Sequence, residues 1–407
     1  MKRIVLANLA GPYNPGDQAI LQGSLKLIRK TYPESKITLI TRNIAQQETY
    51  RHLGCDAVPS YPNVERMATD SLLKKSWGGL QALLTRPLAK EVIRSSDAVF
   101  LIGGGYFYSY RKWLPGLTYL SHLTSVRWGQ KFQKPVIFLP QSYGPFCSGI
   151  AMSLFRKALE GANCIFYREQ ISGDWLNREF PEKSDRFVSM PDCALYLNEQ
   201  DLLGRENPSG SQGPGRRIGV TLRSWNIQGK DEGIYLGRLA RVLNRYVCEK
   251  DYTVRIIVHV HYPTKGEGDW DVSKRFKDRF LTDLPSEKIE WCNAEPYFTL
   301  PQISSLYREC DLVVGMRLHS CLMSMILGRP ALAVGYQPKS EGILKSLGLH
   351  ELYLGSWAEV EENILGEKIN QVLGSTPEWT KKIQEVLSQG RQQIDDAFQA
   401  NRSYWEK

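Results

Sequence analysis

The feature that most constrains the fold is the run at 310–320, which reads Cys-Asp-Leu-Val-Val-Gly-Met-Arg-Leu-His-Ser. Its apolar residues predict a short buried strand, and Gly315 predicts where that strand ends. Arg317 and His319 then follow the strand. In an open parallel sheet, ligands bind at the carboxyl ends of the strands. A permanent cation and a group that titrates near neutral pH therefore indicate chemistry on an anionic substrate.

Strand-like and helix-like segments alternate along the chain. In the first half, strands are predicted at 3–9, 36–41, 98–102 and 136–139, with a helix at 17–31. In the second half, strands are predicted at 217–223, 253–261, 312–314 and 331–334, with helices at 235–249 and 302–308. This alternation predicts an α/β fold in which helices cover parallel sheets.

The two halves also resemble each other, because 96–103 is similar to 310–315 and 134–139 is similar to 329–334. A chain of 407 residues is long enough for about two domains. We therefore predict two Rossmann-like, doubly wound domains that face each other across a cleft.

A linker is predicted at 207–215, because this segment is rich in Gly, Pro and Ser and has no apolar anchor. It separates an N-terminal Rossmann-like domain at 1–206 from a C-terminal one at 216–375. The tail at 376–407 is amphipathic and is predicted to be helical.

The net charge of +9 favours anionic partners such as phosphorylated metabolites or lipid phosphates. No nucleic acid partner is expected, because the chain has no arginine-rich tail and no nucleic-acid-binding motif. Eight cysteines without paired or zinc-type spacing predict reduced thiols and a cytoplasmic location.

Neither a signal peptide nor a transmembrane helix is predicted, because no apolar run is long enough. The segment 72–86 mixes apolar residues with cations. It predicts either peripheral contact with the anionic inner face of a membrane or an ordinary loop.

Two glycine motifs follow predicted strands. Gly16 permits a tight turn before the first helix, and Asp17 can cap that helix or help its N–H groups to hold an anion or a sugar hydroxyl. Gly103, Gly104 and Gly105 either let a ligand approach closely or form a plain turn. The aromatic and basic stretch that follows, at 106–113, suits either sugar stacking or core packing.

Three arginines, Arg168, Arg223 and Arg317, each come after a predicted strand. A surface ion pair explains each one singly, but the set favours convergence on one cleft that binds phosphate. Each charge-assisted bond to a phosphate contributes about 1.5–3 kcal/mol. Lys339, after the last strand, either reaches the same phosphate or is solvated.

His259 and His261 alternate along a predicted strand and so share one face. No third ligand has convincing zinc spacing, so no metal site is predicted. Histidines satisfied by neighbours near the end of the strand are the favoured interpretation.

In this order, the motifs resemble those of the polysaccharide pyruvyl transferase family. The matching segments are 16–21, 103–105, 141–145, 168–172, 191–194, 317–319 and 336–339. The resemblance implies a fold of the glycosyltransferase-B type. It also implies transfer of the enolpyruvyl unit of phosphoenolpyruvate onto two hydroxyls of a sugar, which forms a cyclic ketal and releases phosphate during cell-surface polysaccharide biosynthesis. Phosphoenolpyruvate is then a co-substrate, and no other cofactor is implied.

The resemblance also implies roles for particular residues. Arg168 and Arg317 would bind the phosphate and carboxylate of phosphoenolpyruvate, and His319 would act on the reacting carbon. The donor-binding candidates are Arg168, Arg223, Arg317, Leu318, His319 and Lys339, of which Arg223 is included because it follows a predicted strand. The candidates for acceptor binding or for the general base are Asp17, Gly104, Gly105, Gln141, Asp192 and His261.

Two departures from the family pattern concern acceptor recognition, since Gln18 and Cys193 stand where an acidic residue and a proline are common. Two other functions stay open at this point. One is a nucleotide-sugar glycosyltransferase or epimerase of the same architecture, and the other is a non-catalytic partner in glycan assembly. The expected acceptor is a sugar, either lipid-linked or nucleotide-linked.

Overall fold

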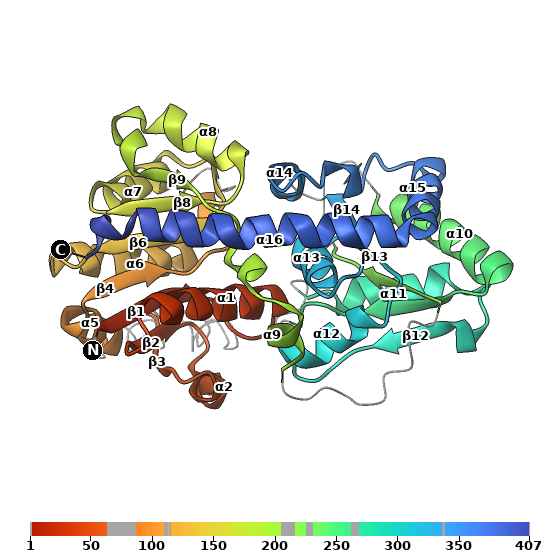
Figure 1. Ribbon diagram of the computed structural model, residues 1–407, viewed down its shortest axis with the longest axis horizontal. Helices are drawn as coiled ribbons and strands as arrows, with labels where there is room; N and C mark the ends of the chain where they lie inside the picture. The colour runs from red at the N-terminus through yellow and green to blue at the C-terminus, as the bar shows by residue number, and fades with distance from the viewer. Residues whose placement is uncertain are drawn as a thin grey trace. The chain divides into compact units, whose positions relative to one another are not determined.

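The computed structural model describes residues 2–62, 87–109, 113, 115–204, 216–224, 231–261, 268–335 and 338–406. The predicted linker at 207–215 and the predicted membrane-contact segment at 72–86 lie outside these ranges. The chain forms two compact units, each of which contains a parallel sheet (Figure 1). The first unit is Met1–Pro12, Ile20–Tyr196 and Arg391–Lys407, and the second is Tyr13–Ala19 and Leu197–Gly390.

The main sheet of the first unit has the order β3-β2-β1-β4-β6-β8-β9, and its neighbouring strands are parallel. The strands are β1 (Arg3–Leu9), β2 (Lys36–Thr41), β3 (Asp56–Pro59), β4 (Ala98–Leu101), β6 (Val136–Gln141), β8 (Cys164–Tyr167) and β9 (Phe187–Ser189). A separate parallel pair joins β5 (Phe107–Ser109) to β7 (Tyr143–Phe146). The central strands β4 and β6 are buried along their whole length, as expected for a sheet covered on both faces.

The helices of the first unit pack around these strands. They are α2 (Gln47–His52), α5 (Leu88–Ser95), α6 (Leu117–Lys131), α7 (Gly149–Glu160), α8 (Gln170–Glu179) and most of α1 (Pro15–Thr31). Leu123 and Val126 of α6 and Phe155 of α7 belong to a core that also contains Phe107 and Phe138. The first turn of α1 belongs to the second unit.

The sheet of the second unit has the order β12-β11-β10-β13-β14-β15 and is parallel throughout. The strands are β10 (Arg217–Thr221), β11 (Thr253–Ile257), β12 (Ile289–Cys292), β13 (Leu312–Gly315), β14 (Ala331–Gly335) and β15 (Tyr353–Ser356). The helices are α9 (Glu199–Leu203), α10 (Glu232–Lys250), α11 (Trp270–Phe280), α12 (Leu300–Arg308), α13 (Leu318–Ile326), α14 (Pro338–Ser346), α15 (Glu362–Gly374) and α16 (Thr376–Ala400), whose last turns belong to the first unit.

The predicted α/β class with two parallel sheets is confirmed. The strand predicted at 253–261 is wrong in its last four residues, because β11 ends at Ile257. Its neighbour β12 ends at Cys292, which is the residue paired with Ile257, so no ladder continues beyond that point. His259 and His261 therefore do not share the face of a strand. The tail predicted to be helical, at 376–407, contains the whole of α16.

Among the described residues, no helix combines the length and the apolar character needed to cross a bilayer.

Candidate active site

Polar side chains collect at the carboxyl edge of the sheet in the second unit. Thr221 at the end of β10 pairs with Gly315 at the end of β13, and Arg223 and Arg317 each come two residues later. His259 follows the end of β11, the neighbour of β10 on its other side, by the same interval. A histidine and two arginines thus follow the ends of three adjacent parallel strands, at one edge of the sheet.

The turn between β13 and α13 holds Arg317 and His319 in place. Arg317 is the N-cap residue of α13, and its carbonyl accepts a 2.6 Å hydrogen bond from the Ser320 hydroxyl. The same hydroxyl lies 2.7 Å from Thr221 Oγ1. Only glycine fits before this turn, since a Cβ at Gly315 would come within 2.9 Å of both hydroxyls. Leu318 and His319 then occupy the first two helical positions, where backbone N–H groups have no acceptor within the helix.

Arg317 forms a bidentate ion pair with Asp269. Its Nη2 lies 2.5 Å from Asp269 Oδ1, and its Nε lies 3.0 Å from Oδ2. The Asp269 side chain is completely buried, and 11% of the Arg317 side chain is exposed. Such paired geometry fixes a guanidinium far better than a single contact does.

The first turn of α1 packs against His319. A Cβ built on Gly16 would lie 2.7 Å from His319 Cγ and 2.8 Å from its Nδ1. The N–H of Gly16 donates to Asn14 Oδ1 at 3.0 Å, which shapes the turn before the helix. Asp17 belongs to the same turn. Two of the predicted motifs, far apart in the sequence, therefore meet within the second unit.

His259 and His261 flank the same region, and both favour the neutral form. His259 is buried, with Nδ1 2.7 Å from the Tyr307 hydroxyl. Burial, together with the positive charge of Arg317, holds the pKa of His259 well below its usual range. Nε2 of His261 donates to the carbonyl of Val258 at 3.1 Å, and burial lowers the pKa of this imidazole. The N–H of His261 donates to the carbonyl of Tyr13, beside the turn that carries Gly16.

The remaining donor candidate of this unit, Lys339, lies in the first turn of α14, after β14, and is partly buried. Arg223 is partly buried as well. Over the described residues, no group of three or more His, Cys, Asp or Glu side chains is placed to hold a metal ion.

Arg168 lies at the carboxyl edge of the first unit's sheet, directly after β8, in a buried polar network. Its Nη1 lies 2.5 Å from Asp192 Oδ2, and its Nε donates to Ser142 Oγ at 2.9 Å. Glu169 Oε2 is 3.8 Å from the same Nε. The other oxygen of Asp192 accepts from the N–H of Ala194. Both carboxylate oxygens are engaged, which is the environment of an ion-pair partner for Arg168.

The glycines after β4 lie beside the end of β6. A Cβ on Gly103 would come within 2.2 Å of the Pro140 carbonyl oxygen, so a close approach of two backbones requires glycine here. The carbonyl of Gly104 accepts from the N–H of Ser142, next to the buried Gln141.

Of the aromatic stretch that follows, Phe107 is a core residue, whereas Trp113 is 85% exposed. The Tyr106 ring packs against His122 at a tilt of 30°, with ring centres 4.7 Å apart. Gly105 is partly buried. Residues 110–112 lie outside the described residues.

A family model of polysaccharide pyruvyl transferases matches residues 14–338, which span the motifs just described. The chain belongs to the polysaccharide pyruvyl transferase family. It is therefore a transferase, as predicted.

A relative of this pyruvyl transferase family member is the amylovoran biosynthesis protein AmsJ of Erwinia amylovora, which is 23% identical over 93% of this chain and 94% of AmsJ. Solved structures of UDP-GlcNAc 2-epimerases are similar in fold. The Neisseria meningitidis enzyme has a TM-score of 0.60 at 13% identity over 98% of this chain and 99% of its own. The Methanocaldococcus jannaschii enzyme has a TM-score of 0.60 at 12% identity over 92% and 93% of the two chains. These similarities confirm the predicted glycosyltransferase-B-type fold and show the fold alone.

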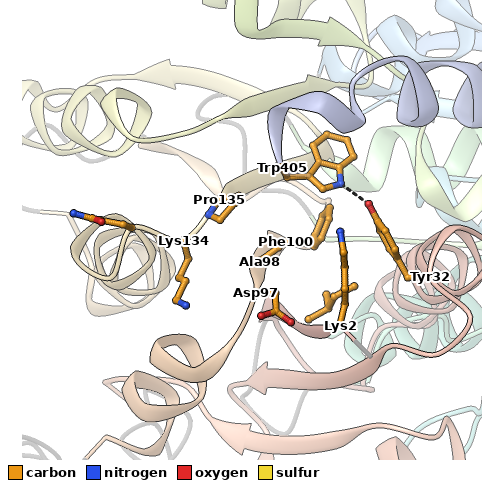
Figure 2. Close-up of a pocket in the computed structure, with 10 residues that line it drawn as sticks. Lys2, Tyr32, Asp97, Ala98, Phe100, Lys134, Pro135 and Trp405 are labelled. Atoms are coloured by element: carbon orange, nitrogen blue, oxygen red, sulfur yellow. Dashed lines mark hydrogen bonds between the residues drawn. The ribbon is translucent and has the colours of Figure 1, made fainter. Parts of the chain in front are cut away.

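A pocket of about 380 Å³ in the first unit of the transferase was not predicted (Figure 2). Lys2, Asp97 and Pro135 lie just before β1, β4 and β6, so the pocket is at the amino edge of the sheet, opposite the edge that carries Arg168. Trp405 donates to the Tyr32 hydroxyl at 2.9 Å beside it. Burial raises the pKa of this hydroxyl to about 12.

The structure of the transferase thus groups the predicted residues unit by unit. Gly16, Asp17, His261, Arg317 and His319 gather in the second unit. Gly104, Gln141, Arg168 and Asp192 gather in the first. Asp269, which lies immediately before α11, was missed, because its contact with Arg317 joins residues 48 positions apart.

Proposed function

We propose that this transferase moves the pyruvyl unit of phosphoenolpyruvate onto two hydroxyls of a sugar and forms a cyclic ketal. The observation that best supports the proposal is the turn in which Arg317 and His319 begin α13 while Gly16 packs on the imidazole. A fixed cation, a titratable ring and the N-terminus of a helix suit a small substrate that carries both phosphate and carboxylate.

Donor binding rests on charge. Arg317 pairs with one anionic group of phosphoenolpyruvate, and the N-terminus of α13 adds favourable dipoles. The further donor-binding candidates of this unit are Arg223, which follows β10 at the same edge of the sheet, and Lys339 in α14. Leu318 is proposed to make van der Waals contact with the donor. Arg168 is the candidate cation of the first unit.

His319 is the proposed general acid. It gives a proton to the methylene carbon of phosphoenolpyruvate, which becomes a methyl group and leaves C2 electrophilic. General acid catalysis of this kind contributes about 10²–10⁴-fold. One sugar hydroxyl then attacks C2. A second hydroxyl attacks the same carbon, phosphate leaves with the electron pair of its C–O bond, and the ketal ring closes.

The proton balance calls for a base. Of the two hydroxyl protons, one replaces the proton that His319 gave and the other is released to the base and solvent. His261 suits this task best, because its Nε2 already donates to the Val258 carbonyl and so leaves the lone pair on Nδ1. Asp17, in the turn beside His319, is the second candidate. Asp192 is engaged with Arg168, and we assign it a structural role.

The acceptor belongs to the carbohydrate chemistry of a cell-surface polysaccharide, by similarity to the amylovoran biosynthesis protein AmsJ. Gly104, Gly105 and Gln141 of the first unit are the proposed acceptor contacts. An acceptor carried on a lipid would bring the protein to the anionic face of a membrane, which agrees with the net charge of +9.

The test is incubation of the full chain with phosphoenolpyruvate and a panel of sugars, sugar nucleotides and lipid-linked sugars. We expect phosphate release that needs both substrates and a product with one new methyl group bound to a ketal carbon by NMR. In heavy water that methyl group should carry one deuterium, because the proton comes from His319. Turnover of a nucleotide sugar without phosphoenolpyruvate would instead identify a glycosyltransferase or an epimerase. If phosphoenolpyruvate neither reacts nor shifts the melting temperature, a non-catalytic role in glycan assembly is indicated.

A further inference from the structure

We infer that Asp269 is the positioning residue that fixes the direction of the Arg317 guanidinium, and that donor affinity depends on it. The statement about affinity rests on the function proposed above. Neither the family motifs nor the predicted site includes Asp269.

The contact is specific to one edge of the arginine. Asp269 accepts from Nε at 3.0–3.1 Å and from Nη2 at 2.5 Å. Because a guanidinium is planar, two bonds to this edge fix the plane and the rotation of the whole group. The carboxylate thereby sets the direction in which the rest of the guanidinium faces.

Asp269 is itself held rigidly. Its side chain is completely buried, and Oδ2 also accepts from the N–H of Val260 at 3.0 Å. Its own N–H donates to the Val260 carbonyl at 2.9 Å, and its carbonyl accepts from Ser273 in the first turn of α11. Because its backbone is bonded on both sides and its buried carboxylate also accepts from Val260, Asp269 cannot follow a moving arginine, so it orients Arg317 rather than merely neutralising it.

The same carboxylate connects two parts of the site. Val260 lies between His259 and His261, in the segment that leaves β11, whereas Arg317 begins α13. One oxygen of Asp269, Oδ2, contacts both the Val260 N–H and the Arg317 Nε. Asp269 therefore holds the histidine segment and the arginine turn in a fixed arrangement. A site that binds both the phosphate and the carboxylate of a donor requires such an arrangement.

The experiment compares wild type with Asp269→Asn, Arg317→Ala and the double variant. Asparagine keeps the shape but supplies only one acceptor oxygen and no charge. We expect Asp269→Asn to raise the KM for phosphoenolpyruvate about tenfold or more, with a smaller change in kcat. In the Arg317→Ala background the same change should not weaken donor binding further, because Asp269 acts through Arg317. The control is Asp278→Asn on the same helix, whose carboxylate makes an exposed pair with Lys274 and should leave KM unchanged.

A second measurement does not need the donor. The Nε–H of Arg317 should give a side-chain NMR signal that exchanges slowly in folded wild type and is lost in Asp269→Asn. Absence of a slowly exchanging Nε–H in wild type overturns the inference even if the variant fails to fold. An unchanged KM in a folded Asp269→Asn also overturns it. A wild type that shows the protected signal but ignores phosphoenolpyruvate supports the positioning by Asp269 and rejects the proposed function instead.

Discussion

Gly16 and His319 are in direct contact, since a Cβ on Gly16 would lie only 2.7 Å from His319 Cγ. Real Cβ atoms essentially never approach a ring so closely, so any other residue at 16 must displace the imidazole. The absence of a side chain at the start of α1 is therefore part of what positions the proposed general acid.

The first prediction concerns Gly16→Ala. We expect kcat to fall at least about tenfold, because the displaced imidazole no longer reaches the methylene carbon and well-placed general acids contribute about 10²–10⁴-fold. The helix itself should tolerate the change, since alanine is the better helix former. Steady-state phosphate release and a thermal melt of the same preparation check the two parts.

Gly149→Ala is the matched control, because Gly149 begins α7 and a Cβ there would meet nothing within 4 Å. It should leave kcat unchanged. Equal losses of activity in the two variants would show that the contact with His319 is not what matters at position 16.

Most of the fold could be predicted from local sequence patterns. The predicted strands at 3–9 and 36–41 have the observed bounds of β1 and β2, because apolar residues buried on both faces of a parallel sheet leave a continuous signal. The prediction that extended β11 to His261 was wrong, since the end of a strand depends on where its neighbours end. That information lies elsewhere in the chain.

Within the candidate site, too, some residues have a local sequence signal and others do not. Arg317 and His319 stand out in the sequence because they follow an apolar run and a glycine. Asp269 does not, because its bond to Arg317 joins residues 48 positions apart and no local pattern encodes it. The pocket beside Lys2 and Trp405 could not be predicted either, because its lining residues come from both ends of the sequence and no local pattern encodes their contact.

The second prediction concerns the Arg168–Asp192 pair. Both side chains are buried, with 7% and 0% exposed, so loss of one partner leaves an uncompensated charge. We expect Asp192→Ala to reduce the free energy of unfolding by about 3–5 kcal/mol. Urea unfolding followed by fluorescence measures it.

An exposed pair on α8 provides the comparison. Arg178 and Glu179 are 3.0 Å apart, and 69% of the Arg178 side chain is exposed. Glu179→Ala should cost no more than about 1 kcal/mol. If the two variants lose the same stability, the buried network around Arg168 does not behave as an ion pair.

The third prediction concerns Tyr307, whose hydroxyl lies 2.7 Å from Nδ1 of the buried His259. Tyr307→Phe leaves that nitrogen unsatisfied in the interior, which costs about 1–3 kcal/mol. Tyr404→Phe, which removes an exposed hydroxyl that donates to the Asp185 carbonyl, should cost less. Chemical denaturation of both variants tests the difference, and equal losses would speak against a buried bond at Tyr307.

The fourth prediction follows from His122 of the first unit. Burial, helped by the charge of Arg42, holds the pKa of His122 well below its usual range. The unfolded chain, with an ordinary pKa of about 6.5, then binds a proton that the folded chain does not bind. The folded state therefore loses stability relative to the unfolded state as the pH falls below about 6.5, by up to about 1.4 kcal/mol per pH unit, and this loss is absent above that pH. His122→Gln should therefore flatten the fall in the free energy of unfolding between pH 7.5 and pH 5.5.

His52→Gln changes an exposed histidine and should leave that fall as steep as in wild type. Parallel slopes for wild type and His122→Gln would mean that His122 accepts its proton in the folded protein after all.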